Sequence, residues 1–172
     1  MHYLFSIGDK IIYGFEGVFT VKEFTASPID KNDTRQFYVL SPAHGPAGNI
    51  IITPIDNGRG IMRSIMSRDE ALDLIDRIPE IPTLTVENEK RRRDVYRQAL
   101  QSATCDSLIA IIKTVGERRE LLAKAKKRIS ESDNDYERLA KLCIYGELAE
   151  VLEIPFDTVE GFISERLSGA RI

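Results

Sequence analysis

The amino-acid sequence predicts an α+β protein with a strand-rich N-terminal domain and an all-helical C-terminal domain. Residues 5–66 contain short segments of β-branched and aromatic residues that are separated by turn residues, with no helical pattern between them. From residue 85 onward, apolar residues recur at helical spacing. We therefore predict a barrel domain over residues 1–66, a helix and proline-bounded linker over 67–83, and a helical domain over 84–172.

Five strands are expected in the first domain, at residues 11–13, 18–24, 37–40, 49–53 and 61–65. Gly14 and Gly17 allow a tight reversal after the first strand, and Asn57-Gly58 is a strong hairpin signal before the last one. Because no helix separates the strands, they can only pair in antiparallel fashion. Closure into a small Tudor/SH3-like β-barrel is the simplest way to pair them.

A single helix is predicted between the two domains. Ser67-Arg68-Asp69-Glu70 forms a capping box at its start, and Pro79 ends it. Each proline disfavours the α conformation in the preceding residue, so Pro79–Pro82 is expected to be a stiff, extended linker. This linker is the predicted domain boundary.

Four helices are expected in the second domain, joined by short loops into a bundle. The first contains the segment Glu87–Leu100. The second is expected to start at Thr104 or Asp106, the third at Ser132–Asp135 and the fourth at Asp157–Glu160. The run Asp133-Asn134-Asp135 is interpreted as helix capping, because a calcium loop requires a glycine and a terminal glutamate that are missing here.

Charge is distributed unevenly along the chain, whose formal net charge is −3. Residues 84–128 carry 12 basic and 6 acidic side chains, a balance of +6, whereas residues 129–172 carry 4 basic and 10 acidic ones, a balance of −6. A basic segment inside an acidic protein predicts a local anionic partner. The alternative is a basic helix face that only contacts solvent.

The basic side chains are densest in Glu87–Leu100. Projection at helical spacing predicts that Lys90, Arg93 and Arg97 share one exposed flank and that Arg91 lies on the other. Arg92 falls on the side of the apolar stripe, so it is expected to pair with an acid or to extend toward solvent rather than to bind a ligand.

No catalytic or metal-binding motif is found in the sequence. Walker, GxSxG and HExxH patterns are missing, and Cys105 and Cys143 are far apart. No acidic residue lies in an apolar context that would raise its pKa toward general-acid work. We therefore expect a non-enzymatic protein without cofactor, metal or small-molecule ligand. The chain also lacks a long apolar run and a secretory signal, which predicts a cytoplasmic protein without a membrane span.

Three segments carry a resemblance to a known family: GDKIIYGFEGVFTVKEF at the start, NIIITPIDN before the hairpin, and YGEL at residues 145–148. In this order and spacing, followed by a basic helix, they make the sequence similar to the CarD family of bacterial transcription regulators (CarD/CdnL type), in the form found in Firmicutes. The resemblance implies a nucleoid-associated regulator whose Tudor-like domain binds the β subunit of RNA polymerase by strand pairing. It also implies that the helical domain contacts promoter DNA and modulates open-complex stability.

Carried over to this chain, the resemblance assigns polymerase binding to the strand Asn49, Ile50, Ile51, Ile52, Thr53 and Pro54, and DNA binding to Lys90, Arg91, Arg93 and Arg97. Two departures change the expected contacts. Ile52 stands where family members often have an arginine. The chain also has no tryptophan, and Asn88 or Glu89 stands where the family's minor-groove tryptophan is found. We therefore expect contact mainly with the phosphate backbone.

Two other functions remain open from the sequence. The protein could be an interaction adaptor whose basic helix packs against an acidic surface, including its own acidic C-terminal segment. It could also be a Tudor-like reader with an aromatic cage of Tyr13, Phe15, Phe37 and Tyr38, although these residues fit core strands better.

Overall fold

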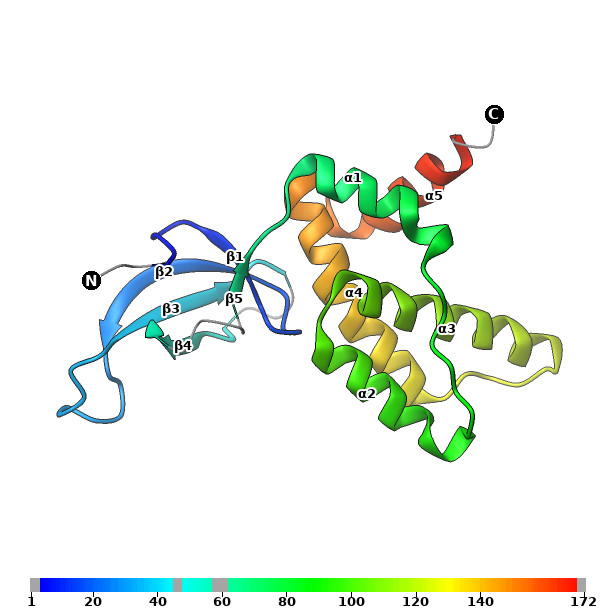
Figure 1. The fold of residues 1–172 in the computed structure, drawn as a ribbon, viewed down its shortest axis with the longest axis horizontal. Helices are drawn as coiled ribbons and strands as arrows, with labels where there is room; N and C mark the ends of the chain where they lie inside the picture. Colours follow the sequence, from blue (N-terminus) through cyan, green and yellow to red (C-terminus); the bar gives the residue numbers. More distant parts are fainter. Residues whose placement is uncertain (1–3, 45–47, 57–61, 170–172) are drawn as a thin grey trace. The chain divides into compact units, whose positions relative to one another are not determined.

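The structure is a computed structural model that describes residues 4–44, 48–56 and 62–169. The chain divides into two compact units, Met1–Ile65 and Met66–Ile172. Within the described ranges, the strands lie in the first unit and the helices in the second (Figure 1). The α+β class predicted from the sequence is confirmed.

The first unit is a five-stranded antiparallel sheet with the strand order β4-β3-β2-β1-β5. The strands are β1 (Lys10–Tyr13), β2 (Val18–Ala26), β3 (Gln36–Pro42), β4 (Ile51–Pro54) and β5 (Met62–Ser64). β2 and β3 are the longest and lie in the interior of the sheet (Figure 1). The short strands β4 and β5 form the opposite edges.

The predicted closure into a barrel is wrong. Closure requires the two edge strands to pair, but within the described residues β4 pairs only with β3, and β5 pairs only with β1. β4 has four residues and β5 has three, so each covers only part of its neighbour. The result is an open sheet with two edges.

One apolar cluster forms the core of the strand-rich unit. Its buried members come from the N-terminal segment and from four strands: Phe5, Ile11, Phe19, Val21, Tyr38, Leu40 and Met62. The Tyr38 hydroxyl accepts hydrogen bonds from the backbone N–H groups of Leu4 and Phe5, at 3.1 and 3.2 Å. The residues before β1 are thereby fastened to the centre of the sheet.

The predicted reversal between the first two strands is confirmed. Gly14 and Gly17 have φ angles of 51° and 101°, a region that other residues rarely adopt. The Tyr13 N–H group donates to the Gly17 carbonyl at 3.0 Å. The Asn57-Gly58 hairpin signal falls outside the described residues.

The second unit is a bundle arranged around α4, which contacts each of the other α-helices (Figure 1). The helices are α1 (Arg68–Arg77), α2 (Arg92–Ser102), α3 (Cys105–Lys124), α4 (Glu131–Leu152) and α5 (Val159–Gly169). Short 3₁₀ turns are η2 (Ile78–Glu80), η3 (Glu89–Arg91) and η4 (Phe156–Thr158). α3 and α4 pack against each other, and each has fully buried apolar residues: Leu108 and Ile111 on α3, Ile144 and Leu148 on α4.

Helix starts agree with the sequence in two places and differ in a third. Ser67 and Glu70 form the predicted capping box at α1, and Thr104 caps α3 by accepting from the Ser107 N–H group. The cap of α4 is Ser130, whose hydroxyl accepts from the Asp133 N–H group at 3.1 Å. The capping interpretation of Asp133–Asp135 is therefore wrong.

The predicted connector, residues 67–83, packs within the helical unit. α1 contacts α4 and α5, and Ile81 is 3% exposed. Residues Ile78–Glu80 form a 3₁₀ turn instead of an extended segment, and the Lys113 ammonium donates to the Ile78 carbonyl at 2.8 Å. The chain divides before this segment, at Ile65/Met66, rather than within it.

In the part of the chain that the structure describes, the helices are too short or too polar to cross a membrane.

Candidate functional site

The densest positive charge lies where the chain enters α2. Asn88 caps this turn, because its side-chain oxygen accepts a hydrogen bond from the Lys90 N–H group at 3.0 Å. Residues Glu89–Arg91 then form a 3₁₀ turn that continues into α2. Upstream, the Leu84 N–H group donates to the Thr114 hydroxyl of α3 at 2.8 Å, which fixes the approach of the chain.

Three of the predicted DNA-binding side chains are exposed and unpaired. Lys90, Arg91 and Arg93 form no ion pair with any described residue. Arg97 is also exposed, but it pairs with Asp94 one turn earlier, and both side chains are 56% exposed. Water competes strongly for an exposed ion pair, so Arg97 remains accessible to another anion.

Arg92 points inward, as its position on the apolar side predicted. Its Nε atom lies 2.9 Å from the Asp133 carboxylate of α4, and its side chain is only 14% exposed. Arg118 of α3 reaches the second oxygen of the same carboxylate at 3.2 Å. Asp133 belongs to α4 and is fully buried. Its two ion pairs therefore connect α2, α3 and α4 at one point.

The two arginines share a second carboxylate, that of Glu89. Arg118 Nη1 lies 3.1 Å from Glu89 Oε1, and Arg92 Nη1 donates to Glu89 Oε2. Asp133, Arg92, Glu89 and Arg118 therefore form a closed ring of alternating charges, which we call the charge ring. Burial lowers the pKa of Arg92, but the hydrogen bond and charge of Asp133, together with Glu89, outweigh this effect and raise it. Arg92 is thus held in its charged form.

A second ion-pair cluster joins α3 to α4. Arg119 donates to Glu137 of α4, and Lys141 lies 3.2 Å from the same carboxylate. Burial of Glu137 raises its pKa, but the hydrogen bond from Arg119 and the charge of Lys141 lower it more strongly, so the net pKa is below its ordinary value. Part of the basic segment is thereby neutralised by the acidic segment of the same chain.

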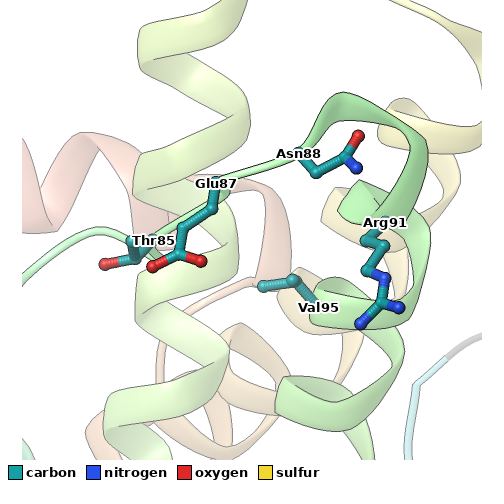
Figure 2. A pocket seen from close by; sticks show the side chains of 5 residues that line it. All are labelled: Thr85, Glu87, Asn88, Arg91 and Val95. Atoms are coloured by element: carbon teal, nitrogen blue, oxygen red, sulfur yellow. The ribbon is translucent and has the colours of Figure 1, made fainter.

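A cleft of about 440 Å³ lies beside the exposed cations. It is lined by Thr85, Glu87, Asn88, Arg91 and Val95. Figure 2 shows Thr85 and Glu87 on the extended segment at one side, with Arg91 and Val95 on the helix at the other. Arg91, which the helical projection of the sequence placed apart from the other cations, therefore lines one side of this cleft.

Further exposed cations lie at the end of α3 and in the turn after it, where Lys124, Lys126, Lys127 and Arg128 have no ion pair with any residue in the described ranges. Lys126 has a φ angle of 56°, and its N–H group donates to the Ala123 carbonyl at 2.9 Å. The placement of these cations at a helix C-terminus agrees with the favourable electrostatics expected there.

The predicted protein-binding segment, Asn49–Pro54, lies at an edge of the sheet. Strand β4 starts at Ile51, two residues later than predicted, so Asn49 and Ile50 precede it. Ile51 packs against the core and Thr53 is 5% exposed, whereas Ile50 and Ile52 are 59% and 42% exposed. Alternation along the strand thus gives one core face and one exposed apolar face.

The register of β4 also decides where its backbone groups point. Ile55 N–H donates to Gln36 of β3 at 3.0 Å, and these two residues continue the register in which Thr53 faces Tyr38 and Ile51 faces Leu40. Since hydrogen-bonded pairs alternate along antiparallel strands, Ile51 and Thr53 bond to β3, and the N–H and carbonyl groups of Ile52 point away from it. Pro54 has only a carbonyl to offer at this outer edge.

The aromatic residues considered for a cage do not form one. Tyr38 and Phe37 are 1% and 7% exposed, and Tyr38 belongs to the core cluster. Tyr13 packs edge-on against Phe19, with ring centroids 6.1 Å apart. The structure therefore removes the basis for the aromatic-cage interpretation.

Two fully buried carboxylates were missed in the sequence. Besides Asp133, Glu147 of α4 is fully buried and accepts a hydrogen bond from the Met66 N–H group at 2.8 Å. Both residues fall at helical spacing on the core face of α4, which was the available signal. Within the described ranges, no group of three or more His, Cys, Asp or Glu side chains is arranged to hold a metal ion.

Comparison with models of known protein families finds no match for this chain, and comparison with curated proteins finds no similar sequence.

We predict that Asp133→Asn destabilises the helical unit, because two partly buried guanidinium groups lose their shared counter-charge. The expected loss in the free energy of unfolding is about 3 kcal/mol. It should appear in urea titration as a lower midpoint with an unchanged slope. Asp135→Asn is the matched control, since Asp135 is 58% exposed and lies 3.5 Å from Arg138. An equal effect of the two substitutions contradicts the role given to Asp133.

Proposed function

We propose that this protein is a non-enzymatic transcription regulator that bridges RNA polymerase and promoter DNA, as its resemblance to the CarD family implies. The observation that carries the proposal is the sorting of positive charge around α2. Arg92, Arg118 and Arg119 are neutralised by carboxylates of α4, whereas Lys90, Arg91 and Arg93 remain exposed and unpaired within the described residues. Unpaired cations at a rigid helix end suit an extended polyanion.

The DNA contact that we propose is a grip on the phosphate backbone. Lysine and arginine position a protein on DNA through phosphate oxygens, which carry no direct sequence information. The structure offers no apolar wedge in this region: Asn88 caps the turn and Glu89 pairs with two arginines. A binding mode that leaves the bases stacked follows from these roles.

For the polymerase contact we propose that the outer edge of β4 pairs with a strand of the β subunit. The Ile52 N–H and carbonyl groups point away from β3, and the exposed side chains of Ile50 and Ile52 add apolar area beside them. Strand addition uses such main-chain groups for affinity and the alternate side chains for specificity. Pro54, which has no N–H group, limits the paired segment to a few residues.

An interaction adaptor is the second candidate, and one observation favours it. The ion pairs of Arg92, Arg118 and Arg119 with α4 are the self-neutralisation that the adaptor hypothesis predicts. They leave Lys90, Arg91 and Arg93 exposed, so the two hypotheses differ in whether these three residues bind a polyanion. Retention on heparin at moderate salt separates them, since an adaptor without a polyanion site flows through.

For DNA binding, we predict that the double substitution Lys90→Glu/Arg93→Glu weakens binding to duplex DNA by at least about tenfold at low salt and lowers the slope of log affinity against log salt by about 2. The reason is the loss of two phosphate contacts. Fluorescence anisotropy at several salt concentrations measures both quantities. Lys22→Glu/Lys31→Glu, an equal charge change on exposed residues of the other unit, is the matched control. Equal affinities of the wild type and the Lys90→Glu/Arg93→Glu variant for DNA would contradict the proposed DNA contact.

For polymerase binding, we predict that Ile52→Pro abolishes capture of a β-subunit fragment, because it removes the outward N–H group without removing a bond to β3. Ile52→Ala keeps the N–H group and should reduce affinity only by the lost apolar contact, about three- to tenfold. Titration calorimetry with the purified fragment measures the difference, and circular dichroism verifies that both variants fold. Full binding by a folded Ile52→Pro variant contradicts strand pairing at this edge.

A further inference from the structure

Glu89 is the one exposed member of the charge ring. Its side chain is 62% exposed, compared with 14% for Arg92, 29% for Arg118 and 0% for Asp133. Asp133 fixes the two guanidinium groups from the buried side through their Nε atoms. Their Nη1 atoms converge on the two oxygens of Glu89 from the other side.

Two fixed guanidinium groups that converge on one pair of oxygens form an anion-binding site. Arginine binds phosphate and carboxylate in the same way, with parallel N–H donors to two oxygens. A phosphodiester carries a single negative charge, as Glu89 does, so it can replace Glu89 without changing the charge of the ring. Because Asp133 already holds both arginines in place, little conformational entropy is lost when the anion binds.

We infer that the Glu89 carboxylate occupies a two-arginine phosphate site, and that a phosphate group displaces it. This inference rests on the proposed function where the phosphate belongs to DNA. Displacement is feasible because the Glu89 side chain is exposed and an ion pair in contact with water is weak. Lys90 and Arg93, which lie one and four residues further along the chain, add positive charge around the same place. Arg92, which sequence reasoning set aside, thereby becomes a phosphate ligand.

Glu89 is thus an internal competitor of the phosphate. It keeps Arg92 and Arg118 paired when no polyanion is present, and it lowers the affinity for one. Removing its charge while keeping its shape should expose both guanidinium groups to an incoming phosphate. The expected result is tighter binding of the polyanion with one additional phosphate contact.

The test compares Glu89→Gln with Glu117→Gln in the full chain, using duplex DNA and inorganic phosphate as probes. Glu117 is exposed, precedes Arg118 directly, and forms no ion pair with a described residue, so it controls for the loss of one negative charge. Glu89→Gln is expected to tighten DNA binding roughly three- to tenfold and to steepen the salt dependence by about 1, whereas Glu117→Gln gives a smaller gain and an unchanged slope. In the Arg118→Gln background the gain from Glu89→Gln should disappear.

The two probes separate the possible sources of the phosphate. A gain for DNA alone assigns the site to a backbone phosphate, and a gain for inorganic phosphate alone, measured by phosphorus NMR, assigns it to a free phosphate group. Equal gains for Glu89→Gln and Glu117→Gln, or a gain that persists without Arg118, overturn the inference. If binding to DNA does not depend on Lys90 and Arg93, the proposed DNA contact is contradicted. The measurement with inorganic phosphate then still shows whether Arg92 and Arg118 bind a phosphate group.

Discussion

The buried carboxylate of Asp133 is the contact on which the arrangement of the helical unit depends. A fully buried charge is costly unless it is paired, and Asp133 is paired twice, with Arg92 of α2 and Arg118 of α3. Since Asp133 belongs to α4, three helices meet at this one side chain. The direction in which the start of α2 faces follows from this pairing, because Arg92 cannot turn outward without losing its hydrogen bond to Asp133 Oδ1.

The same constraint divides the positive charges into two groups. Arg92 is drawn inward, whereas its neighbours Arg91 and Arg93 are exposed, since successive positions of a helix face different directions. The acidic C-terminal segment neutralises the arginines that face α4. The exposed cations at the start of α2 remain available to bind an anion. Opposite charges on different segments of one chain thus contribute both to folding and to the proposed DNA interface. The net charge of the chain does not reveal either contribution.

Much of this arrangement was predictable from local sequence patterns. The capping box at Ser67, the turn at Gly14 and Gly17, and the inward position of Arg92 each depend on a few neighbouring residues. That the sheet stays open was not predictable, because closure depends on the length and pairing of two distant edge strands. The partner of Arg92 lies 41 residues away in the sequence, so no local pattern identified it. Asp133 resembled a cap because a short acidic run looks the same whether it caps a helix or enters a core.

The central claim is that the chain links RNA polymerase to promoter DNA, and a hydroxyl-radical footprint on a polymerase–promoter complex tests it most directly. The account predicts additional backbone protection when the protein is present, and loss of that protection both with Ile52→Pro and with Lys90→Glu/Arg93→Glu. The two variants act through different units of the chain, so only a bridging protein gives the same loss with both. An identical footprint with and without the protein contradicts the account.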